Sequence, residues 1–288
     1  MKSLFFRFIF LGFLALAVSG TGCSRSSPSA SDRPFKIGSF LPLSGDLSAL
    51  GQEIQRGAEI AKMELEREGT KIEYISEDDQ FKPTASVQAA NKLLNIDKVD
   101  AVFTATVQES KPVIGSFRHK RQPLLVAWDS NQFLKNAGES VFSIGFSTEA
   151  SGQRMAEYAY GELGLRKIAM LQHIDEFSEL IGTAFESRFK ELGGRIVLAE
   201  KRQVGEKDYR TFLSKVKSSD ADGMYFPLIP PVHGPLLSQV QQLGFKGKLL
   251  GADGLIQDEI KEAGKAAEGV YYTNIYAEQP EMISRKYR

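Results

Sequence analysis

The feature that most constrains the fold is a regular alternation of short apolar runs with longer amphipathic segments. Apolar runs such as Phe35–Leu41, Ala101–Ala105 and Gly223–Phe226 have the length and composition of buried strands. Segments between such runs, for example Gln52–Glu68 and Glu176–Leu192, repeat apolar residues at helical spacing. Strands separated by helices imply parallel βαβ units and an α/β fold. Because the strands are nearly all apolar, we expect sheets that are covered on both faces.

The same pattern runs through most of the chain and divides near residue 145 into two series, which predicts two α/β lobes. Further strands are expected at 72–76, 124–127, 141–144, 167–171, 196–200, 248–251 and 269–273. Further helices are expected from Pro83 onward and at 109–121, 131–137, 150–163, 209–218, 234–243 and 258–263.

The N-terminus has the pattern of a secretory signal. Lys2 and Arg7 precede the apolar run Phe8–Val18, which is short for a membrane span but suits the hydrophobic part of a signal peptide. We therefore assign residues 1–22 to a signal peptide and expect an exported protein, periplasmic or at the cell surface.

The single cysteine, Cys23, follows a patch of small residues, as at a bacterial lipoprotein cleavage site. We expect Cys23 to be lipidated and to anchor the mature chain to the membrane; the alternative is ordinary cleavage nearby, which leaves a free thiol. Residues 23–34 are rich in serine and carry no large apolar side chain. This composition predicts a flexible tether.

Composition excludes several functions. Lys plus Arg number 36 and Asp plus Glu number 36, so the chain has no net charge and no character of a nucleic-acid-binding protein. One cysteine permits no intramolecular disulfide and no cysteine-based zinc site. No glycine-rich phosphate or dinucleotide motif follows a predicted strand. We therefore expect no cofactor, no metal and no nucleic-acid partner.

Two groups of polar residues could have either a chemical role or only a structural one. His173 follows a predicted strand close to Asp175, so a catalytic histidine, as in a hydrolase, is an alternative to a polar residue at the rim of the sheet. The run Glu77–Asp79 contains three carboxylates, which suggests either a divalent-cation site or a solvated loop before a helix. In both cases the plainer interpretation is favoured, and the sequence predicts no enzyme.

Several stretches together resemble the type I periplasmic binding proteins, the branched-chain amino-acid (Leu/Ile/Val) receptors of ABC importers. The similarity extends from Phe35 to about Tyr276. It is carried by the following ordered stretches: Phe35–Gly38 with Leu41–Gly45, Gly57–Ala58, Glu77–Gln80 with Pro83–Leu93, Gly205–Tyr209, Gly251–Gly254 and Ala267–Val270.

The resemblance implies two hinged lobes that close on a small ligand in the cleft between them, without catalysis. It implies a first lobe at 35–146, to which residues 275–288 return, and a second lobe at 147–274. Members of this family continue beyond a point equivalent to Arg288, so the C-terminal part appears truncated. The implied partners are an amino acid or analogue and an ABC permease in the inner membrane; the alternative is a sensor for amides or short peptides without a transport role.

The resemblance also implies site residues. Asp253 occupies the position whose carboxylate holds the ligand ammonium group, although an aspartate before Gly254 also suits a turn. Ser130 takes the place of a hydroxyl that binds the ligand carboxylate, with a helix cap as the alternative. Trp128 and Phe177 are candidate walls of the pocket, and core packing is the alternative for both.

Two positions depart from the family pattern. A small hydroxyl residue is expected after the third strand, where this chain has Val107 or Gln108; Thr106 or Gln108 is the candidate substitute. Ile229 stands where the family has a second aromatic residue. These departures leave open an amide, a short peptide or another small polar metabolite as the ligand.

Overall fold

The computed structural model describes residues 33–274. The predicted signal peptide, the lipidation site Cys23 and the segment 275–288 lie outside these residues, and the tether is described only at its last two residues. Within 33–274, none of the helices combines the length and apolarity that a membrane crossing needs.

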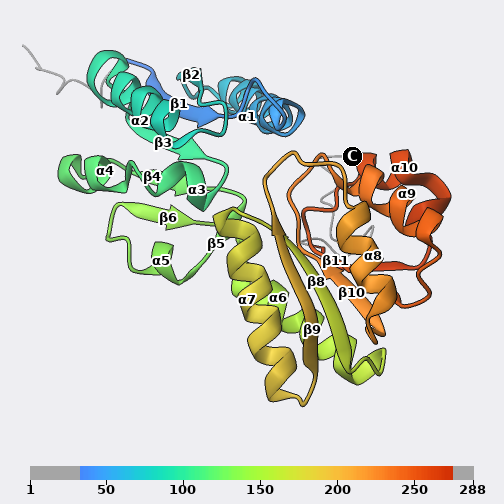
Figure 1. Cartoon of the computed structure of the whole chain (residues 1–288). Coiled ribbons are helices and arrows are strands. Elements are labelled where there is room, and N and C mark those ends of the chain that lie inside the picture. Colours follow the sequence, from blue (N-terminus) through green and yellow to red (C-terminus); the bar gives the residue numbers. More distant parts are fainter. Residues whose placement is uncertain (1–32, 275–288) are drawn as a thin grey trace, which may run out of the picture. The chain divides into compact units, whose positions relative to one another are not determined.

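The first lobe contains a five-stranded parallel sheet in the order β2-β1-β3-β4-β6 (Figure 1). Its strands are β1 (Phe35–Leu41), β2 (Ile72–Asp78), β3 (Ala101–Thr104), β4 (Leu124–Val126) and β6 (Val141–Ser143). Its helical segments are α1 (Ser48–Arg67), α2 (Pro83–Lys92), the π-helical turn η1 (Leu93–Asp97), α3 (Val107–Ser110), α4 (Ile114–Lys120) and α5 (Gln132–Lys135).

The helix predicted at Glu109–Arg121 is wrong as a single element, because the structure has two short helices there, α3 and α4. Pro112 lies between them. A proline lacks a backbone N–H and its ring clashes with the preceding turn, so the first helix ends before Pro112 and the second begins after it.

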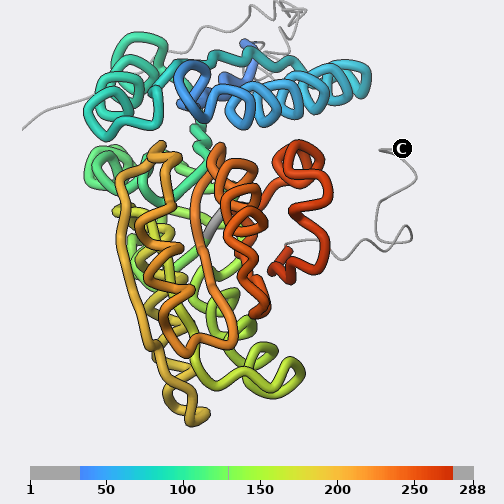
Figure 2. The backbone as a smooth tube through the Cα atoms, turned by 45° about the vertical axis from the view of Figure 1, so that its right-hand side comes forward, coloured from blue at the N-terminus to red at the C-terminus, as the bar shows by residue number. Residues whose placement is uncertain are grey.

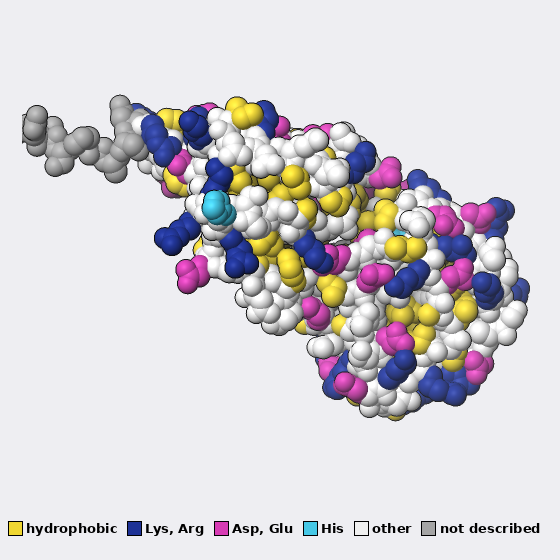
Figure 3. All heavy atoms as spheres, turned by 60° about the vertical axis from the view of Figure 1, so that its left-hand side comes forward, with side chains coloured by type: hydrophobic (Ala, Val, Ile, Leu, Met, Phe, Trp, Pro, Cys, Tyr) yellow, Lys and Arg dark blue, Asp and Glu magenta, His cyan; other side chains and the backbone are white. Residues whose placement is uncertain are grey.

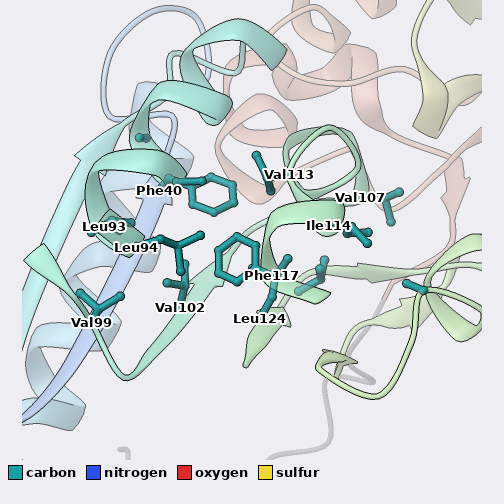
Figure 4. Close-up of a cluster of buried hydrophobic side chains, with 14 of the residues drawn as sticks. Phe40, Leu93, Leu94, Val99, Val102, Val107, Val113, Ile114, Phe117 and Leu124 are labelled. Atoms are coloured by element: carbon teal, nitrogen blue, oxygen red, sulfur yellow. The ribbon is translucent and has the colours of Figure 1, made fainter. Parts of the chain in front are cut away.

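One face of the first sheet packs into a closed core. Phe40, Val102 and Leu124 point from the strands toward Leu93 and Phe117, which come from the helical segments on that side (Figure 4). The opposite face carries Ile37, Tyr74 and Phe103 on the strands, and α1 covers it only in part. A groove of about 300 Å³ remains beside α1. Helices therefore flank both faces of this sheet, but the coverage of the second face is incomplete beside α1.

The second lobe contains a five-stranded parallel sheet in the order β12-β11-β10-β8-β9. Its strands are β8 (Lys167–His173), β9 (Arg195–Arg202), β10 (Gly223–Phe226), β11 (Lys248–Gly251) and β12 (Val270–Tyr272). Its helical segments are α6 (Thr148–Glu157), η2 (Tyr158–Glu162), α7 (Glu176–Glu191), α8 (Arg210–Ser218), α9 (His233–Leu243), α10 (Gln257–Ala263) and η3 (Gly264–Ala267). Figure 2 follows the same chain path as a tube.

Alternate residues of the central strands enter two separate cores, as the two-residue period of a strand requires. Met224 and Phe226 face the core formed with α8 and α9, whereas Tyr225 faces the core formed with α6 and α7. In the second core Phe185 stacks on Tyr225 with ring centroids 4.2 Å apart. The prediction of a sheet covered on both faces is confirmed for this lobe.

Two short strands absent from the sequence-based prediction connect the lobes. Residues 129–130 form β5 and Phe146–Ser147 form β7, and they pair in parallel with Ser130 opposite Ser147. Ser147 then caps α6, since its side chain accepts a hydrogen bond from the backbone N–H of Ala150 at 3.3 Å. Acidic and basic side chains are interspersed over the visible surface (Figure 3), in keeping with the balanced composition.

Candidate functional site

In parallel sheets the loops that follow the strands gather at one edge, and ligands of open α/β sheets bind there. Loops of this kind from both lobes line a cavity of about 460 Å³, which we call the interlobe pocket. Its lining residues are Ser44, Gly45, Asp46, Leu47, Gln80, Phe81, Lys82 and Gln108 from the first lobe, and Ile174, Asp175, Val204 and Pro230 from the second.

An ion pair joins the two lobes close to this pocket. Lys111 Nζ, at the end of α3, lies 3.1 Å from both carboxylate oxygens of Glu176, the first residue of α7. The two side chains are partly exposed, so the pair adds little net stability. It does bring the α3 segment, which carries Gln108, against the loop that carries Asp175.

A second cavity lies further along the carboxyl edge of the second sheet. It has a volume of about 500 Å³, and Asp253, α6, β12 and the connecting segments at 146–147 and 273–274 line it. We call it the Asp253 pocket. Asp253 follows β11, which pairs with β10, and the loop after β10 lines the interlobe pocket. The two pockets therefore draw on neighbouring strand ends.

The carboxyl group of Asp253 is the main charged feature of this second pocket. Its residue is 8% exposed, Ser151 Oγ donates to its Oδ1 at 3.2 Å, and its Oδ2 has no hydrogen-bond partner. Burial raises the pKa of Asp253 to about 7, against the opposing effect of hydrogen bonds from its own backbone and from Ser151. A buried carboxyl oxygen without a partner lacks the compensation that burial requires, which a cation or a hydrogen-bond donor would supply.

Gly254 allows the chain to turn where Asp253 is held. A Cβ atom at this position would lie 2.2 Å from the carbonyl oxygen of Leu228, so only glycine fits against that backbone. Asp253 can therefore belong both to a turn and to a binding site. The close approach of Gly254 to the Leu228 backbone fixes the position of the Asp253 carboxyl group.

The remaining walls of the Asp253 pocket offer hydroxyl, aromatic and cationic groups. Ser151 Oγ lies 2.9 Å from Thr273 Oγ1. Tyr158 and Tyr271 both line the pocket, with ring centroids 5.8 Å apart. Arg154 lines it as well, and its side chain is 75% exposed. A ligand with an ammonium group, a carboxylate and an apolar side chain has a complementary group here for each part.

The predicted site residues divide between these regions. Gln108 lines the interlobe pocket and Asp253 lines the second pocket. Ser130 lies in β5, and it pairs with Ser147, which lines the Asp253 pocket. The alternative role of Ser130 as a helix cap is wrong, because Asn131 caps α5 and accepts from the backbone N–H of Leu134 at 3.0 Å.

The other three predicted residues lie outside the linings of both pockets. Thr106 is the N-cap residue of α3, and its backbone N–H donates to Glu109 Oε2 at 2.7 Å. Trp128 is half-buried, and its backbone N–H donates to the carbonyl oxygen of Ala105 at 2.8 Å. Phe177 is half-buried in the first turn of α7.

Sequence reasoning missed Ser151 and Thr273, which meet at the Asp253 pocket. They are 122 residues apart in the chain. A serine in the first turns of a helix and a threonine after a short strand carry no signal of their own. Only the pairing of the strand ends and the course of α6 bring these hydroxyl groups together.

The structure corrects the sequence-based interpretation of His173 and Asp79, because both side chains are buried. His173 is fully buried as the last residue of β8, not at the rim, and its Nδ1 accepts from the backbone N–H of Ile229 at 3.2 Å. Burial lowers its pKa to about 4. Asp79 is also fully buried, so Glu77–Asp79 is not a solvated loop; within residues 33–274 no three acidic, histidine or cysteine side chains are grouped as metal ligands.

Comparison with known proteins agrees with this architecture. A family model described as periplasmic binding protein matches residues 34–287. The chain belongs to the periplasmic binding protein family. Its two parallel α/β lobes have the type I fold of that family.

Individual periplasmic binding proteins resemble the chain over most of its length. An amino acid binding protein of Pseudomonas aeruginosa is 27% identical over 255 residues, which are 86% of this chain and 67% of that protein. The crystal structure of the leucine binding protein LivK from Thermotoga maritima has a TM-score of 0.78 and 26% identity, covering 84% of this chain and 70% of the other.

A solute binding protein from Rhodopseudomonas palustris, solved in complex with 3,4-dihydroxy benzoic acid, has a TM-score of 0.76 and 22% identity over 82% of this chain and 67% of the other. The same fold is thus found with different small molecules, and the residues of the pocket must decide the ligand of this periplasmic binding protein.

Proposed function

We propose that this protein is the extracytoplasmic solute-binding component of an ABC importer and that its ligand is an α-amino acid or a close analogue. The observation that carries the proposal is the buried carboxyl group of Asp253, which has one oxygen without a partner and lines a pocket with hydroxyl, aromatic and guanidinium groups. An ammonium group is the partner that such a carboxylate needs, because a buried unpaired charge is costly.

The ligand is placed at the carboxyl edge of the second sheet, with its ammonium group at Asp253. Its carboxylate is placed near Arg154 and the hydroxyl groups of Ser147 and Ser151, and its side chain against Tyr158. The first-lobe loops of the interlobe pocket close toward this edge when the segments that connect the lobes bend. Thr106, Gln108, Ser130, Trp128 and Phe177 stay candidate contacts of the closed form.

The role is binding without turnover. The one histidine considered as a catalytic base, His173, is buried, and its Nδ1 already accepts a backbone hydrogen bond. Export through a signal peptide at residues 1–22 and a lipid anchor at Cys23 belong to the same proposal. They place the receptor beside a permease in the membrane. A sensor would use the same pocket. Deletion of the gene separates the two roles, because only loss of a transport receptor abolishes amino-acid uptake.

Titration calorimetry with L-leucine and L-isoleucine tests the ligand class. We expect Asp253→Asn to weaken binding by about 2–5 kcal/mol, the effect of removing one partner of a desolvated charge pair. Asp258→Asn is the matched control, since Asp258 lies nearby in α10 with a side chain 79% exposed and should bind as the wild type does. Equal affinity of wild type and Asp253→Asn would exclude the ammonium site.

An aromatic carboxylic acid is a second candidate ligand, favoured by the tyrosine pair of Tyr158 and Tyr271 in the pocket wall. Such a ligand would need Asp253 protonated, as a donor to its own carboxylate. Its affinity would then fall as the pH rises above about 7, whereas amino-acid affinity would fall as the pH drops below it. Calorimetry with 3,4-dihydroxybenzoate and with L-leucine, each below and above this pH, distinguishes the two ligand classes.

A further inference from the structure

A buried glutamate and a buried histidine of the second lobe join the helices that follow two neighbouring strands. His233 is the first residue of α9 and is 0% exposed, and Glu259 lies in the first turn of α10 and is 3% exposed. The helix α9 follows β10, and α10 follows β11, which pairs with β10 in parallel. Neither side chain lines the Asp253 pocket or the interlobe pocket, so the pair can affect a ligand only through other residues.

Both carboxylate oxygens of Glu259 bind His233. The backbone N–H of His233 donates to Oε1 at 2.8 Å, and the ring nitrogen Nδ1 lies 2.6 Å from Oε2. A carboxylate can only accept hydrogen bonds, so the hydrogen of the second contact lies on Nδ1. Because a backbone donor and a ring donor are both used, the contact fixes the position and the direction of the Glu259 side chain against the start of α9.

The loop between β10 and α9 is held near both of its ends. Near its start, the backbone N–H of Ile229 donates to Nδ1 of the buried His173, on β8, at 3.2 Å. At its end, His233 is bound by Glu259. Pro230, between these two points, lines the interlobe pocket. Glu259 thus attaches α10 to a loop that has its own attachment to the sheet.

The turn that contains Asp253 rests on the same loop. Gly254 approaches the loop so closely that a Cβ atom there would lie 2.2 Å from the carbonyl oxygen of Leu228. A hydrogen bond of 2.9 Å from the backbone N–H of Leu255 to the carbonyl oxygen of Ala252 closes the turn around Asp253. This bond shapes the turn but does not attach it to the rest of the lobe.

The segment that carries Asp253 is attached to the lobe on both sides of the carboxyl group. Before it, β11 pairs with β10 as far as Gly251, which lies opposite Phe226. After it, Glu259 binds the start of α9. Without the second attachment, the segment could pivot about the end of β11. The carboxyl group would then move relative to Ser151, which donates to its Oδ1.

We propose that Glu259 and His233 are positioning residues for ligand binding, whose paired hydrogen bonds hold the far end of the Asp253 turn and so keep the Asp253 carboxyl group in its place in the pocket. The proposal rests on the proposed function in taking Asp253 as a ligand contact. A pair with a purely structural role would stabilise the fold equally, but its effect on ligand affinity would not be coupled to Asp253.

Amide hydrogen exchange of the full chain, without any ligand, tests whether the pair holds the turn. The reporter is the N–H of Leu255, which closes the turn, and the reference is the N–H of Tyr225 in the central strand β10. Glu259→Ala should lower the protection of Leu255 by about tenfold relative to Tyr225. Asp258→Ala is the matched control, because Asp258 lies in the same helical turn with a side chain 79% exposed, and it should leave Leu255 unchanged.

Glu259→Gln separates the hydrogen bonds from the charge. The amide that it introduces can accept from the backbone N–H of His233 and can donate to Nδ1 in the tautomer that carries its hydrogen on Nε2, so both contacts are kept. Leu255 should then stay protected. A loss of protection as large as that of Glu259→Ala would overturn the role given to these bonds.

A double-mutant cycle tests whether the pair acts through Asp253. In the otherwise wild-type chain, Glu259→Ala should weaken L-leucine binding by about tenfold. In the Asp253→Asn background the same substitution should change the affinity by less than about twofold, because the carboxylate that it would displace is already absent. Titration followed by nuclear magnetic resonance measures both affinities, since it reaches the weak binding of the Asp253→Asn chain.

An equal loss of affinity in both backgrounds would overturn the proposal. So would unchanged protection of Leu255 in a folded Glu259→Ala variant. If Glu259→Ala does not fold, His233→Ala takes its place in both experiments; it keeps the backbone bond and loses the ring bond, so the expected losses are smaller. A chain that binds no L-leucine would defeat the proposed function, whereas the exchange of Leu255 needs no ligand and judges the hold of Glu259 on the turn separately.

Discussion

The two lobes have the same kind of sheet but bury it differently. In the second lobe, alternate residues of β8 and β10 enter two closed cores, one with α6 and α7 and one with α8 and α9. In the first lobe, one face packs into a single core, and the other leaves an apolar groove beside α1. The sheet of the second lobe is therefore the more completely buried of the two.

The lobes also differ in the surroundings of their buried acidic side chains. Asp79 and Glu109 in the first lobe accept hydrogen bonds from the backbone N–H groups of Phe81 and Thr106, and Glu109 Oε1 has no partner. Asp253 in the second lobe keeps one oxygen without a partner and lines a cavity. An unpartnered oxygen on a buried acid therefore does not by itself identify a ligand site; Asp253 differs from Glu109 in that it also lines a cavity.

The largest expected effect concerns the cores. Phe185→Ala should lower the free energy of unfolding by about 3–5 kcal/mol, because it empties a fully buried position stacked on Tyr225. Phe103→Ala, on the half-covered face of the first sheet, should cost only about 1–2 kcal/mol. Denaturant unfolding followed by circular dichroism measures both; equal losses would remove the contrast between the lobes.

A smaller effect is expected at His173, a buried polar residue of the second lobe. His173→Ala should destabilise the protein by about 1–3 kcal/mol, since it leaves the buried N–H of Ile229 without an acceptor. His173→Asn, which restores an acceptor, should recover part of the loss. The exposed His119 provides the control, and a His119→Ala variant as destabilised as His173→Ala would contradict the explanation.

The smallest effect sharpens the contrast between the acids. With Asp253 at a pKa of about 7, L-leucine affinity should fall by about tenfold for each pH unit below that value and stay level just above it, because ammonium pairs only with the carboxylate. Calorimetry between pH 5.5 and 8.5 (about three units across the titration) measures the slope. Affinity that does not vary over this range would place the ammonium group elsewhere.

The same titration acts on the unliganded fold with the opposite sign. Asp253 holds its proton in the folded chain up to a pH of about 7, whereas an unfolded chain releases it near the ordinary value for aspartate. The stability of the empty receptor from this group therefore declines as the pH rises between those two values and is then constant. Asp253→Asn should remove that slope from the denaturant-unfolding profile.

Much of the fold could be predicted because strands and helices leave local patterns. Phe35–Leu41, Gly223–Phe226 and Lys248–Gly251 were predicted with the bounds that the structure has. The split of the predicted helix at Pro112 was missed although proline gave the local signal. The paired strands β5 and β7 were missed because two-residue strands have no period to detect.

The candidate site was less accessible to such reasoning. Asp253 was identified through a resemblance in sequence order, and its assignment to the ligand stays a prediction. His173 and Asp79 were assigned to the rim or to solvent, because neighbours in the sequence do not report burial. Ser151 and Thr273 meet only through the packing of α6 against the end of β12, which no local pattern encodes.

The sequence by itself determined the α/β class and the division into two lobes, which rest on the order and period of apolar residues. It also indicated the family, through a resemblance carried by an ordered series of short stretches. Tertiary structure alone decided which polar side chains are buried, which face of the first sheet keeps an apolar groove, and that Asp253 lines a cavity with one oxygen unpartnered. The physical reason is that periodicity is a property of neighbours in the chain, whereas desolvation depends on every group that approaches from elsewhere.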